Sequence, residues 1–386
     1  MGVIQDRLIE KASRARAPIM AAFELLPMCN LQCKMCYVRK SAAEVQRAGG
    51  LKDGDWWLHL AKEAAEMGLC YPLITGGEPL LHPDFFEIMG KMQEMGLQIS
   101  INSNGTTITR ERARWLGKHK PTRINITLYG ASGETYQALC GDGGAYDKVR
   151  QGVEYLKEYG VPVKFNCSVT PQNVQDLDAI VAYAREVQSP LQAATYMVPP
   201  LRRDSTQVGR NERLSPEEAA RARVRMDYLQ AEPEWFVGQA QRYGRFVPLE
   251  ELGALEEAQS AHMACRAGLC SFWVDWRGKM NNCGMYGTAE VALEGRPFAQ
   301  AWDELVERTA AVRYRPACSV CPNRQLCHPC VAMVECECGS REGRPEYVCQ
   351  MNQAYARLYR ETARRYYPEL MEKCRFPGES RESCEL

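Results

Sequence analysis

The feature that most constrains this chain is the uneven placement of its cysteines. Of the 18 cysteines in 386 residues, three fall within 29–36, three within 265–283 and seven within 318–349. A disulfide scaffold explains such a cysteine content only in a small secreted protein, and this chain shows neither property. Metal ligation is therefore the leading interpretation, because multinuclear metal sites need thiols in groups.

Charge and hydropathy argue against several classes of function. Lysine plus arginine (48) balances aspartate plus glutamate (48), so the chain lacks the overall basic field that attracts nucleic acid or anionic lipid. No stretch reaches the apolar length of a membrane span, and residues 1–20 lack the apolar core of a signal peptide. We expect a cytoplasmic protein that binds neither nucleic acid nor membrane.

Apolar strand patterns alternate with helical patterns over the first 200 residues. Strands are expected at 18–26, 71–75, 97–102, 123–128, 162–169 and 191–198. The helices between them are expected at 55–67, 83–95, 109–118, 146–159 and 174–187. This order predicts an α/β fold with a parallel sheet and right-handed crossovers, in the form of a partial (β/α)6 barrel. Its functional loops then lie at the carboxyl ends of the strands.

The length and the changes in pattern predict two main units. A charged helix is expected over residues 216–230, and the segments beyond it are short, with weak periodicity. Bound metal is therefore expected to contribute much of the folding there. The predicted organisation is an N-terminal segment at 1–17, a core domain at 18–231, a bridging region at 232–262, a cysteine-rich domain at 263–355, and a C-terminal helix and tail at 356–386.

The first cysteine group directly follows the first expected strand. Cys29, Cys33 and Cys36 form a CxxxCxxC motif. Three thiolates can hold three irons of a [4Fe–4S] cube and leave the fourth iron with an open coordination position. A zinc knuckle is the alternative, but the motif lacks the nearby CxxC pair or Cys/His partner that a closed zinc site needs.

This triplet resembles the signature of the radical S-adenosylmethionine (radical SAM) superfamily. The resemblance implies that a [4Fe–4S] cluster binds S-adenosylmethionine and donates an electron to it, giving methionine and a 5′-deoxyadenosyl radical. The aromatic residue that usually precedes the third cysteine is replaced by Met35, with Tyr37 just after the motif.

A glycine pair at the end of the second expected strand adds to this resemblance. Glycines let the backbone approach a ligand amine closely, and a nearby carboxylate suits a cation. A glycine pair alone is usually an ordinary turn, but after the cysteine triplet it resembles the family's GGEP motif. The resemblance implies that the methionyl amino group is held by Gly76, Gly77, Glu78 and Pro79.

Four further positions are candidates for the same site. By the resemblance, Ser103 and Thr127 contact the cofactor, and Lys148 meets its carboxylate, where a cation is favourable. An ordinary surface or cap role is the alternative for each. Cys140, in the glycine-rich run at 140–144, is a candidate catalytic hydrogen-atom donor, and an inert loop thiol is the alternative.

The later cysteines show a second specific spacing. A CxxCx5CxxC run is formed by Cys318, Cys321, Cys327 and Cys330. Together with Cys265, Cys283 and Cys349, the run resembles the SPASM extension, which binds two auxiliary [4Fe–4S] clusters in radical enzymes that modify peptides. A zinc ribbon is the alternative for the CxxC pairs.

The SPASM resemblance also implies which cysteines hold each auxiliary cluster. The outer cluster is assigned to Cys318, Cys321, Cys327 and Cys349. The inner cluster is assigned to Cys265, Cys283 and Cys330. For its fourth ligand we favour Cys270, with Cys336, Cys338 or an open iron as alternatives. The remaining cysteines are expected in the core (Cys70, Cys167) and in the tail (Cys374, Cys384).

The resemblance implies an enzyme that abstracts a hydrogen atom from its substrate. The leading interpretation is a ribosomally made peptide that receives a thioether or a C–C or C–X crosslink. The alternatives are a radical dehydrogenase, epimerase or mutase acting on a peptide or small molecule, and an electron-transfer protein, against which GGEP counts. Sulfatase maturases carry an aspartate after the second SPASM cysteine, whereas Gly284 follows Cys283 here, which argues against that activity.

Several partners follow from this interpretation. They are a peptide or small-molecule substrate and a reductant such as flavodoxin or ferredoxin. Only 28 residues precede Cys29, too few for the winged-helix leader-binding domain fused to many peptide maturases, so a leader is expected to bind elsewhere or through a separate protein. Arg202 and Arg203 are candidates for pairing with a substrate carboxylate, and a solvated basic turn is the alternative.

Overall fold

The computed structural model describes residues 3–252, 265–285, 287, 289–328 and 330–373. The chain forms two compact units. Unit 1 contains residues 1–166, 200–206 and 262–313, and unit 2 contains residues 167–199, 207–261 and 314–386. The expected tail cysteines, Cys374 and Cys384, and part of the expected bridging region lie outside the described residues. The predicted domain boundaries stay a prediction.

Unit 1 is built on a sheet whose order follows the predicted α/β pattern. Its strands are β1 (Met20–Glu24), β2 (Tyr71–Thr75), β3 (Ser100–Ser103), β4 (Arg123–Thr127), β5 (Val163–Ser168), β7 (Ser271–Val274), β8 (Lys279–Asn281) and β9 (Val291–Ala292). The order across the sheet is β5-β4-β3-β2-β1-β7-β8-β9. Pairing is parallel from β5 to β7 and antiparallel from β7 to β9. The predicted parallel α/β fold is therefore confirmed.

The last two residues of β5 already belong to unit 2, and β6 (Leu191–Ala194) continues the strand order beyond it. Backbone pairing there includes the Val169 N–H, which donates to the Ala194 carbonyl at 2.8 Å. The six predicted strands are thus present and consecutive in the sheet. The sequence interpretation did not include β7, which pairs with β1 on the other side from β2.

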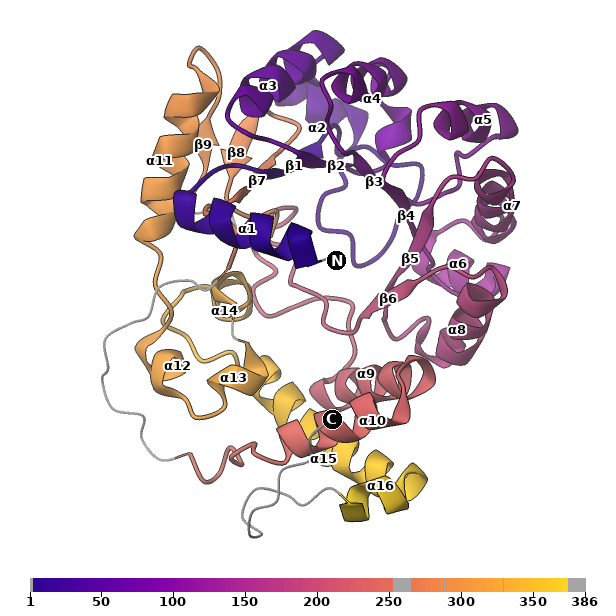
Figure 1. Ribbon diagram of the computed structural model, residues 1–386, viewed down its shortest axis with the longest axis vertical. Coiled ribbons are helices and arrows are strands. Elements are labelled where there is room, and N and C mark those ends of the chain that lie inside the picture. The colour runs from indigo at the N-terminus through magenta and orange to yellow at the C-terminus, as the bar shows by residue number, and fades with distance from the viewer. Residues whose placement is uncertain (1–2, 253–264, 286, 288, 329, 374–386) are drawn as a thin grey trace. The chain divides into compact units, whose positions relative to one another are not determined.

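Helices cover the sheet of unit 1, whose strands carry fully buried apolar side chains such as Ile101 of β3 and Ile124 of β4. Figure 1 shows four of them along the outer side of the strands: α3 (Gly54–Glu66), α4 (Phe85–Glu94), α5 (Arg110–Lys118) and α7 (Ala145–Glu158). Phe23 on β1 packs on Trp57 of α3 with ring centroids 5.5 Å apart. Side-chain caps fix two helix starts, since Asp53 accepts from the Trp56 N–H and Thr109 accepts from the Arg112 N–H.

Unit 1 also contains elements that the sequence interpretation did not include. They are α1 (Val3–Ala15), α2 (Ala42–Arg47), η1 (Pro79–Leu81), α6 (Gly133–Cys140) and α11 (Phe298–Ala310). The Trp302 indole of α11 donates to the Arg16 carbonyl, just after α1, at 2.8 Å. This hydrogen bond joins residues that are 286 positions apart, so a local sequence pattern could not predict it.

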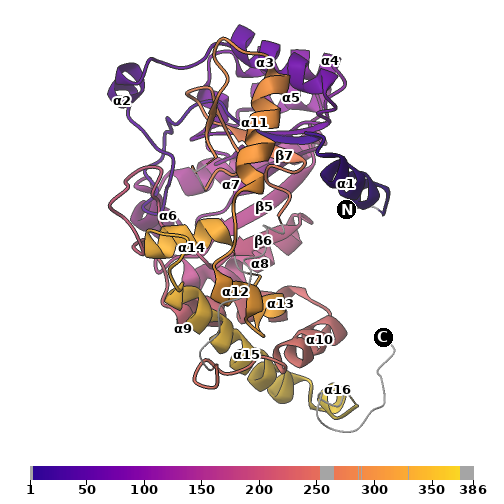
Figure 2. The same cartoon turned by 90° about the vertical axis from the view of Figure 1, so that its left-hand side faces the viewer.

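Unit 2 is mainly helical. Its elements besides β6 are η2 (Val174–Asp176), α8 (Leu177–Glu186), α9 (Pro216–Gln230), α10 (Pro233–Tyr243), α12 (Pro316–Val320), α13 (Arg324–Cys327), α14 (Val331–Cys338), α15 (Glu346–Tyr366) and α16 (Pro368–Lys373). α15 packs against both α9 and α10 (Figure 2). Tyr243 of α10 stacks on Tyr359 of α15 with centroids 5.1 Å apart.

The expectation of short segments after residue 232 is wrong for α15, which has 21 residues. Its buried positions Val348, Met351, Tyr355 and Tyr359 recur at helical spacing, so packing of one apolar face sustains its length. Within the described ranges, no helix combines the length and apolar character needed to cross a membrane.

Candidate metal centres and cofactor site

The loop that follows β1 carries Cys29, Cys33 and Cys36, all half-buried. Backbone N–H groups point at two of the sulfurs, with Leu31 N 3.4 Å from Cys29 Sγ and Arg39 N 3.3 Å from Cys36 Sγ. Burial raises the pKa of Cys29 to about 11, although the Leu31 N–H opposes this effect. The thiolate form of Cys29 therefore needs stabilisation by a positive charge, which a bound metal supplies.

Cys140 lies against this loop. The Gln32 N–H donates to the Cys140 carbonyl at 2.8 Å, and the side chains of Cys140 and Tyr129 both hydrogen-bond to the Cys33 thiol. The contact with Cys140 lowers the pKa of Cys33 and raises that of Cys140. Cys140 is thus a buried residue at the end of α6, whereas the sequence interpretation assigned it to a glycine-rich loop. Its role as a hydrogen-atom donor stays a prediction.

The loop after β2 is held against the start of the cysteine loop. The Gly77 N–H donates to the Leu26 carbonyl at 2.7 Å, and the Glu78 N–H donates to the Met28 carbonyl at 3.0 Å. A Cβ on Gly77 would lie 2.2 Å from the Met28 oxygen, so only glycine allows this approach. Gly76 has a φ of +152°, which also favours glycine. The two motifs are therefore joined through backbone contacts.

Glu78 connects these loops to the end of β3. Its buried carboxylate accepts from Ser103 Oγ at 2.9 Å, from Asn104 N at 2.7 Å and from Leu80 N at 3.3 Å. Burial raises the pKa of Glu78 to about 7, although these hydrogen bonds act to lower it. The Asn104 amide reaches Cys29 Sγ at 3.5 Å. Glu78, Ser103 and Cys29 thus share one network, and Asn104 is a member that the sequence interpretation did not single out.

The remaining predicted cofactor residues have less specific surroundings. Pro79 is buried and begins η1, next to Glu78. Thr127 is the half-buried last residue of β4. Lys148 is exposed on α7, with its Nζ 3.3 Å from Asp142 Oδ2. The cofactor roles of Pro79, Thr127 and Lys148 stay predictions, and the ion pair of Lys148 is that of a surface residue.

Arg202 is engaged inside unit 1. Its guanidinium donates to both carboxylate oxygens of Glu24, at the end of β1, over 2.8 and 3.0 Å, and to the Gly284 carbonyl at 2.8 Å. The Trp273 indole also donates to Glu24, at 3.0 Å. Burial raises the pKa of Glu24, and Arg202 opposes that effect. Arg202 is therefore a structural partner of Glu24, whereas Arg203 is exposed.

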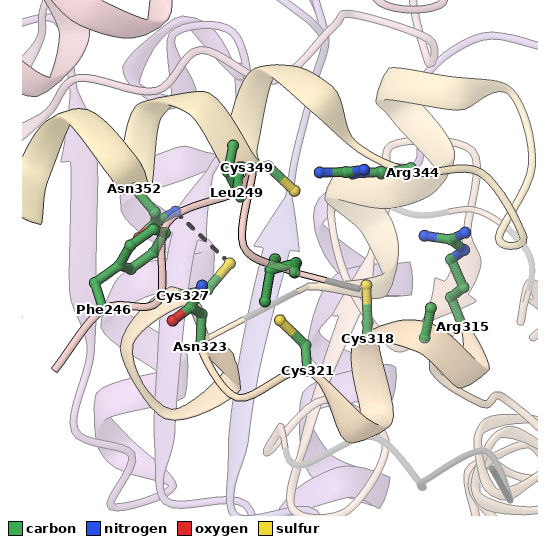
Figure 3. Close-up of a pocket in the computed structure, with 12 residues that line it drawn as sticks. Phe246, Leu249, Arg315, Cys318, Cys321, Asn323, Cys327, Arg344, Cys349 and Asn352 are labelled. Atoms are coloured by element: carbon green, nitrogen blue, oxygen red, sulfur yellow. Dashed lines mark hydrogen bonds between the residues drawn. The ribbon is translucent and has the colours of Figure 1, made fainter. Parts of the chain in front are cut away.

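In unit 2, the four thiols predicted for the outer cluster surround one cavity of about 230 Å³. Figure 3 shows the sulfurs of these residues directed toward a common space: Cys318, Cys321, Cys327 and Cys349. Burial raises the pKa of Cys327 to about 12. Within the described part of the chain, no three His, Cys, Asp or Glu side chains are spaced to hold a single metal ion. Thiols around a cavity fit a larger group, such as a [4Fe–4S] cube with one thiolate on each iron.

Polar side chains line this cavity together with the thiols. Asn352 Nδ2 lies 3.6 Å from Cys327 Sγ. Arg315 and Arg344 hydrogen-bond to Cys318 and Cys349, respectively, and lower the pKa of these thiols, although burial raises it more. These donors suit electron-rich sulfur ligands. None of them was singled out from the sequence.

The cysteines predicted for the inner cluster are divided between the units. Cys265 and Cys283 belong to unit 1, and Cys330 belongs to unit 2. The Ala267 N–H points at Cys265 Sγ over 3.5 Å, and the Met285 N–H points at Cys283 Sγ over 3.4 Å. Their assignment to one cluster stays a prediction.

Cys270, the favoured fourth ligand, is fully buried in a small apolar cluster with Ile9 and Ala12 of α1. Ser13 Oγ donates to its sulfur at 3.1 Å. This placement accounts for Cys270 as a core residue without any metal. Its ligand role, like that of the alternatives Cys336 and Cys338 in α14, stays a prediction.

Comparison with known protein families gives a match over residues 23–184 to the Radical SAM superfamily. The AdoMet-dependent heme synthase of Methanosarcina barkeri is 26% identical over 82% of this chain and 92% of its own length. Mycofactocin maturase MftC of Mycolicibacterium smegmatis is 31% identical over 46% of this chain and 45% of its own length. PqqA peptide cyclase of Granulibacter bethesdensis is 27% identical over 45% and 46%, respectively. The chain thus matches slightly less than half the length of the last two relatives.

Solved structures show the same fold. Streptococcus suis SuiB bound to its precursor peptide SuiA has a TM-score of 0.64 at 18% identity, over 90% of this chain and 80% of SuiB. The structure of anSMEcpe with bound AdoMet has a TM-score of 0.65 at 19% identity, over 92% and 99%. Residues 23–184 therefore form a domain that matches the Radical SAM superfamily, in a chain whose relatives are named as a synthase, a peptide cyclase and a maturase.

Proposed function

We propose that Cys29, Cys33 and Cys36 hold a [4Fe–4S] cluster, that S-adenosylmethionine binds beside it, and that the enzyme modifies a peptide. The observation that carries the cofactor site is the network through which Asn104 joins Cys29 to Glu78. It brings the cysteine loop and the GGEP loop together at the carboxyl ends of β1, β2 and β3, where parallel α/β folds bind their ligands.

The bound cluster and S-adenosylmethionine would supply a 5′-deoxyadenosyl radical that takes a hydrogen atom from the substrate. The chain's own residues would bind and orient this pair. Gly76 and Gly77 let the GGEP loop pack directly on the carbonyls of Leu26 and Met28, and the carboxyl group of Glu78 would lie beside the amino group of the ligand. The Asn104 amide would hold Cys29 in place as a cluster ligand.

We further propose two auxiliary [4Fe–4S] clusters. The outer one is supported by the convergence of four thiols on a single cavity in unit 2. The inner one rests on the spacing of Cys265, Cys283 and Cys330, with Cys270 as the favoured fourth ligand. We also propose a cytoplasmic location and a flavodoxin or ferredoxin as reductant.

The peptide substrate is supported by the named relatives. A peptide cyclase and a mycofactocin maturase are among the curated matches, and SuiB of the same fold was solved with a precursor peptide. We propose a ribosomally made peptide as substrate and a thioether or C–C or C–X crosslink as product. A leader segment of this peptide would bind to a separate protein or to a surface of this chain.

The test uses a short cysteine- or aromatic-rich peptide encoded beside the gene, made with deuterium at its side-chain carbons. We expect deuterium to appear in 5′-deoxyadenosine. In the unlabelled peptide, crosslinking removes two hydrogens, so its mass should fall by two units. Cys140→Ala separates two outcomes. Crosslinking removes hydrogens and needs no hydrogen-atom donor, whereas epimerisation returns a hydrogen to the substrate and would stop if a required donor were lost. Cleavage without deuterium transfer, in the presence of every such peptide, would contradict the peptide proposal.

A second substrate class is favoured by one observation. The heme synthase of Methanosarcina barkeri aligns with 82% of this chain and 92% of its own length, far more than the peptide enzymes do. An iron porphyrin is therefore the second candidate substrate. Incubation with iron-coproporphyrin III distinguishes the two, since a porphyrin substrate would change in mass while the peptides stay unmodified.

A further inference from the structure

Gly284, which directly follows Cys283, is held from two sides. Its carbonyl accepts from the Arg202 guanidinium at 2.8 Å. A Cβ on Gly284 would lie 2.8 Å from ring atoms of Trp273, so its backbone lies directly on the indole and only glycine allows this approach. We define the Cys283 turn as residues 283–285. The position of this turn therefore depends on Arg202 and on Trp273.

Both of these neighbours are anchored on Glu24, the last residue of β1. Arg202 donates to the two carboxylate oxygens of Glu24 at 2.8 and 3.0 Å, and the Trp273 indole donates to one of them at 3.0 Å. The Glu24 side chain is only 1% exposed, so water competes little for these contacts. Two side chains thus connect the Cys283 turn to the carboxyl end of β1, where the loop with the CxxxCxxC motif begins.

Arg202 also contacts the loop with the CxxxCxxC motif. Its guanidinium carbon lies 5.7 Å from the ring centroid of Tyr37, which is within the range of a cation–π interaction. Tyr37 directly follows Cys36 in the sequence, and all the residues of this network belong to unit 1. One guanidinium therefore contacts both the residue after Cys36 and the residue after Cys283.

We propose that Arg202 is a positioning residue that fixes the Cys283 turn relative to Cys36, and so sets the spacing between the catalytic cluster and the inner auxiliary cluster. The inference rests on the proposed function, because it takes Cys36 and Cys283 as ligands of these two clusters. Arginine suits this role, since its planar guanidinium bonds both oxygens of a carboxylate and still has N–H groups to donate to a carbonyl.

The same contacts argue against a substrate carboxylate as the main partner of Arg202. Glu24 already engages both terminal nitrogens of the guanidinium, in the bidentate geometry that a substrate carboxylate would need. An arginine that served only the substrate could be replaced without any change in the Cys283 turn of the substrate-free enzyme. The test therefore uses the substrate-free enzyme.

The test variant is Glu24→Gln/Arg202→Met, reconstituted with iron and sulfide. It removes both charges together, so the net charge is unchanged and most of the stability is retained, but the hydrogen bond to the Gly284 carbonyl is lost. We expect hydrogen exchange of the Cys283 turn to rise at least about tenfold. We also expect a shift in the magnetic interaction between the catalytic and inner clusters, measured by electron paramagnetic resonance of the fully reduced enzyme. Urea denaturation and iron counts verify that the variant is folded and loaded.

Asp275→Asn/Arg277→Met is the matched control in the same unit. Asp275 has a side chain that is 2% exposed and accepts from Arg277 at 2.6 and 2.8 Å, so this pair resembles that of Glu24 in burial and chemistry. The other hydrogen bonds of the control pair go to Glu290 and to the backbone between β7 and β8. We expect exchange of the Cys283 turn in this variant to stay within about threefold of the wild type, with an unchanged magnetic interaction.

Three results would overturn the proposal. They are unchanged exchange of the Cys283 turn in Glu24→Gln/Arg202→Met, an equal rise in the control variant, and a turn that loosens while the magnetic interaction keeps its wild-type value. If the wild-type chain holds no inner cluster, the proposed function fails instead, and iron and sulfide counts of the wild type report that failure separately. The exchange measurement then still decides whether Arg202 holds the Cys283 turn.

Discussion

The two groups of thiols in this chain are supported in different ways. The triplet at Cys29–Cys36 lies in a loop fixed by backbone contacts, including the hydrogen bonds of Gly77 to Leu26 and of Gln32 to Cys140. The group at Cys318–Cys349 is carried largely by two helices of five and four residues, α12 and α13, around a cavity. Helices this short gain little from their own hydrogen bonds and depend on tertiary contacts.

The two thiol groups therefore differ in how much bound metal contributes to the folding of the segments that carry them. A loop tied to a parallel sheet keeps its shape by the packing of that sheet, so its thiols are prepared before metal arrives. The short helices around a cavity are stabilised by the group that occupies the cavity. The free energy of metal binding there therefore also contributes to the free energy of folding. We therefore expect the two units to respond unequally to metal and to mutation.

Removal of iron should have the largest effect. In hydrogen-exchange measurements on apo and reconstituted protein, we expect exchange in residues 316–327 to rise at least about 100-fold without iron, and exchange in β1 to β4 to rise less than about threefold. Cys318→Ser/Cys349→Ser should reproduce the effect in residues 316–327 only. Equal changes in hydrogen exchange in residues 316–327 and in β1 to β4 would contradict the proposed difference between the two thiol groups.

The Glu24–Arg202 pair should be the most costly single contact to break in unit 1. Glu24→Gln leaves a partly buried guanidinium without its carboxylate, and we expect a loss of about 3 kcal/mol in the free energy of unfolding, measured by urea denaturation. Glu24→Gln/Arg202→Met removes both charges and should recover most of that loss. The exposed pair Arg110–Glu158 provides a control, since Arg110→Gln should cost less than about 1 kcal/mol. A small effect of Glu24→Gln would refute this assignment.

Gly77→Ala tests whether backbone contacts fix the first thiol group. The added Cβ would lie 2.2 Å from the Met28 oxygen, so the loops must separate, and we expect a loss of about 2 kcal/mol with reduced iron at the triplet. Gly238→Ala is the matched control, because nothing lies within 4 Å of its Cβ position in α10. That change should be neutral or stabilising by up to about 1 kcal/mol. Normal stability and iron content in Gly77→Ala would contradict the role of the loop contact.

Asn323→Ala should have the smallest effect of the four changes. It removes both hydrogen bonds to Val247 and loosens the segment that lines the outer cavity, for a loss of about 1–2 kcal/mol. Asn323→Asp keeps the acceptor and loses only the donor, so it should cost less. Thermal unfolding and the rate of iron loss to a chelator provide the measurements. Faster iron loss from the triplet than from the outer site would be the opposite of our expectation.

Local patterns were enough to predict many elements of the fold. The bounds of β2 (Tyr71–Thr75) and α9 (Pro216–Gln230) agree with the prediction, because each has a local signal. For α9 the signal is a capping box in which Ser215 and Glu218 bond each other's backbone N–H groups, with Pro216 in the first turn. The parallel order of the first six strands followed from their alternation with helices.

Other elements depend on contacts that a local pattern does not contain. The four residues of β7, Ser271–Val274, of which three are apolar, become a strand because β1 offers an open edge some 250 positions earlier in the chain. Helix α6 was not predicted because the glycines after Cys140 indicated a loop, although Ser132 is a good N-cap residue. The spacing of the cysteines predicted both thiol groups. Their hydrogen-bond partners could not be identified from it, because Asn104 lies 75 positions from Cys29 and Asn352 lies 25 positions from Cys327.

The central claim is that Cys29, Cys33 and Cys36 form a catalytic cluster site separate from the auxiliary sites. The most direct measurement is anaerobic reconstitution, iron and sulfide counting, and an assay for 5′-deoxyadenosine on the wild type and on Cys29→Ala/Cys33→Ala/Cys36→Ala. We predict three clusters in the wild type and, in the triple variant, loss of S-adenosylmethionine cleavage with the auxiliary clusters retained. Zinc in place of iron, or cleavage that survives the triple substitution, would contradict the claim.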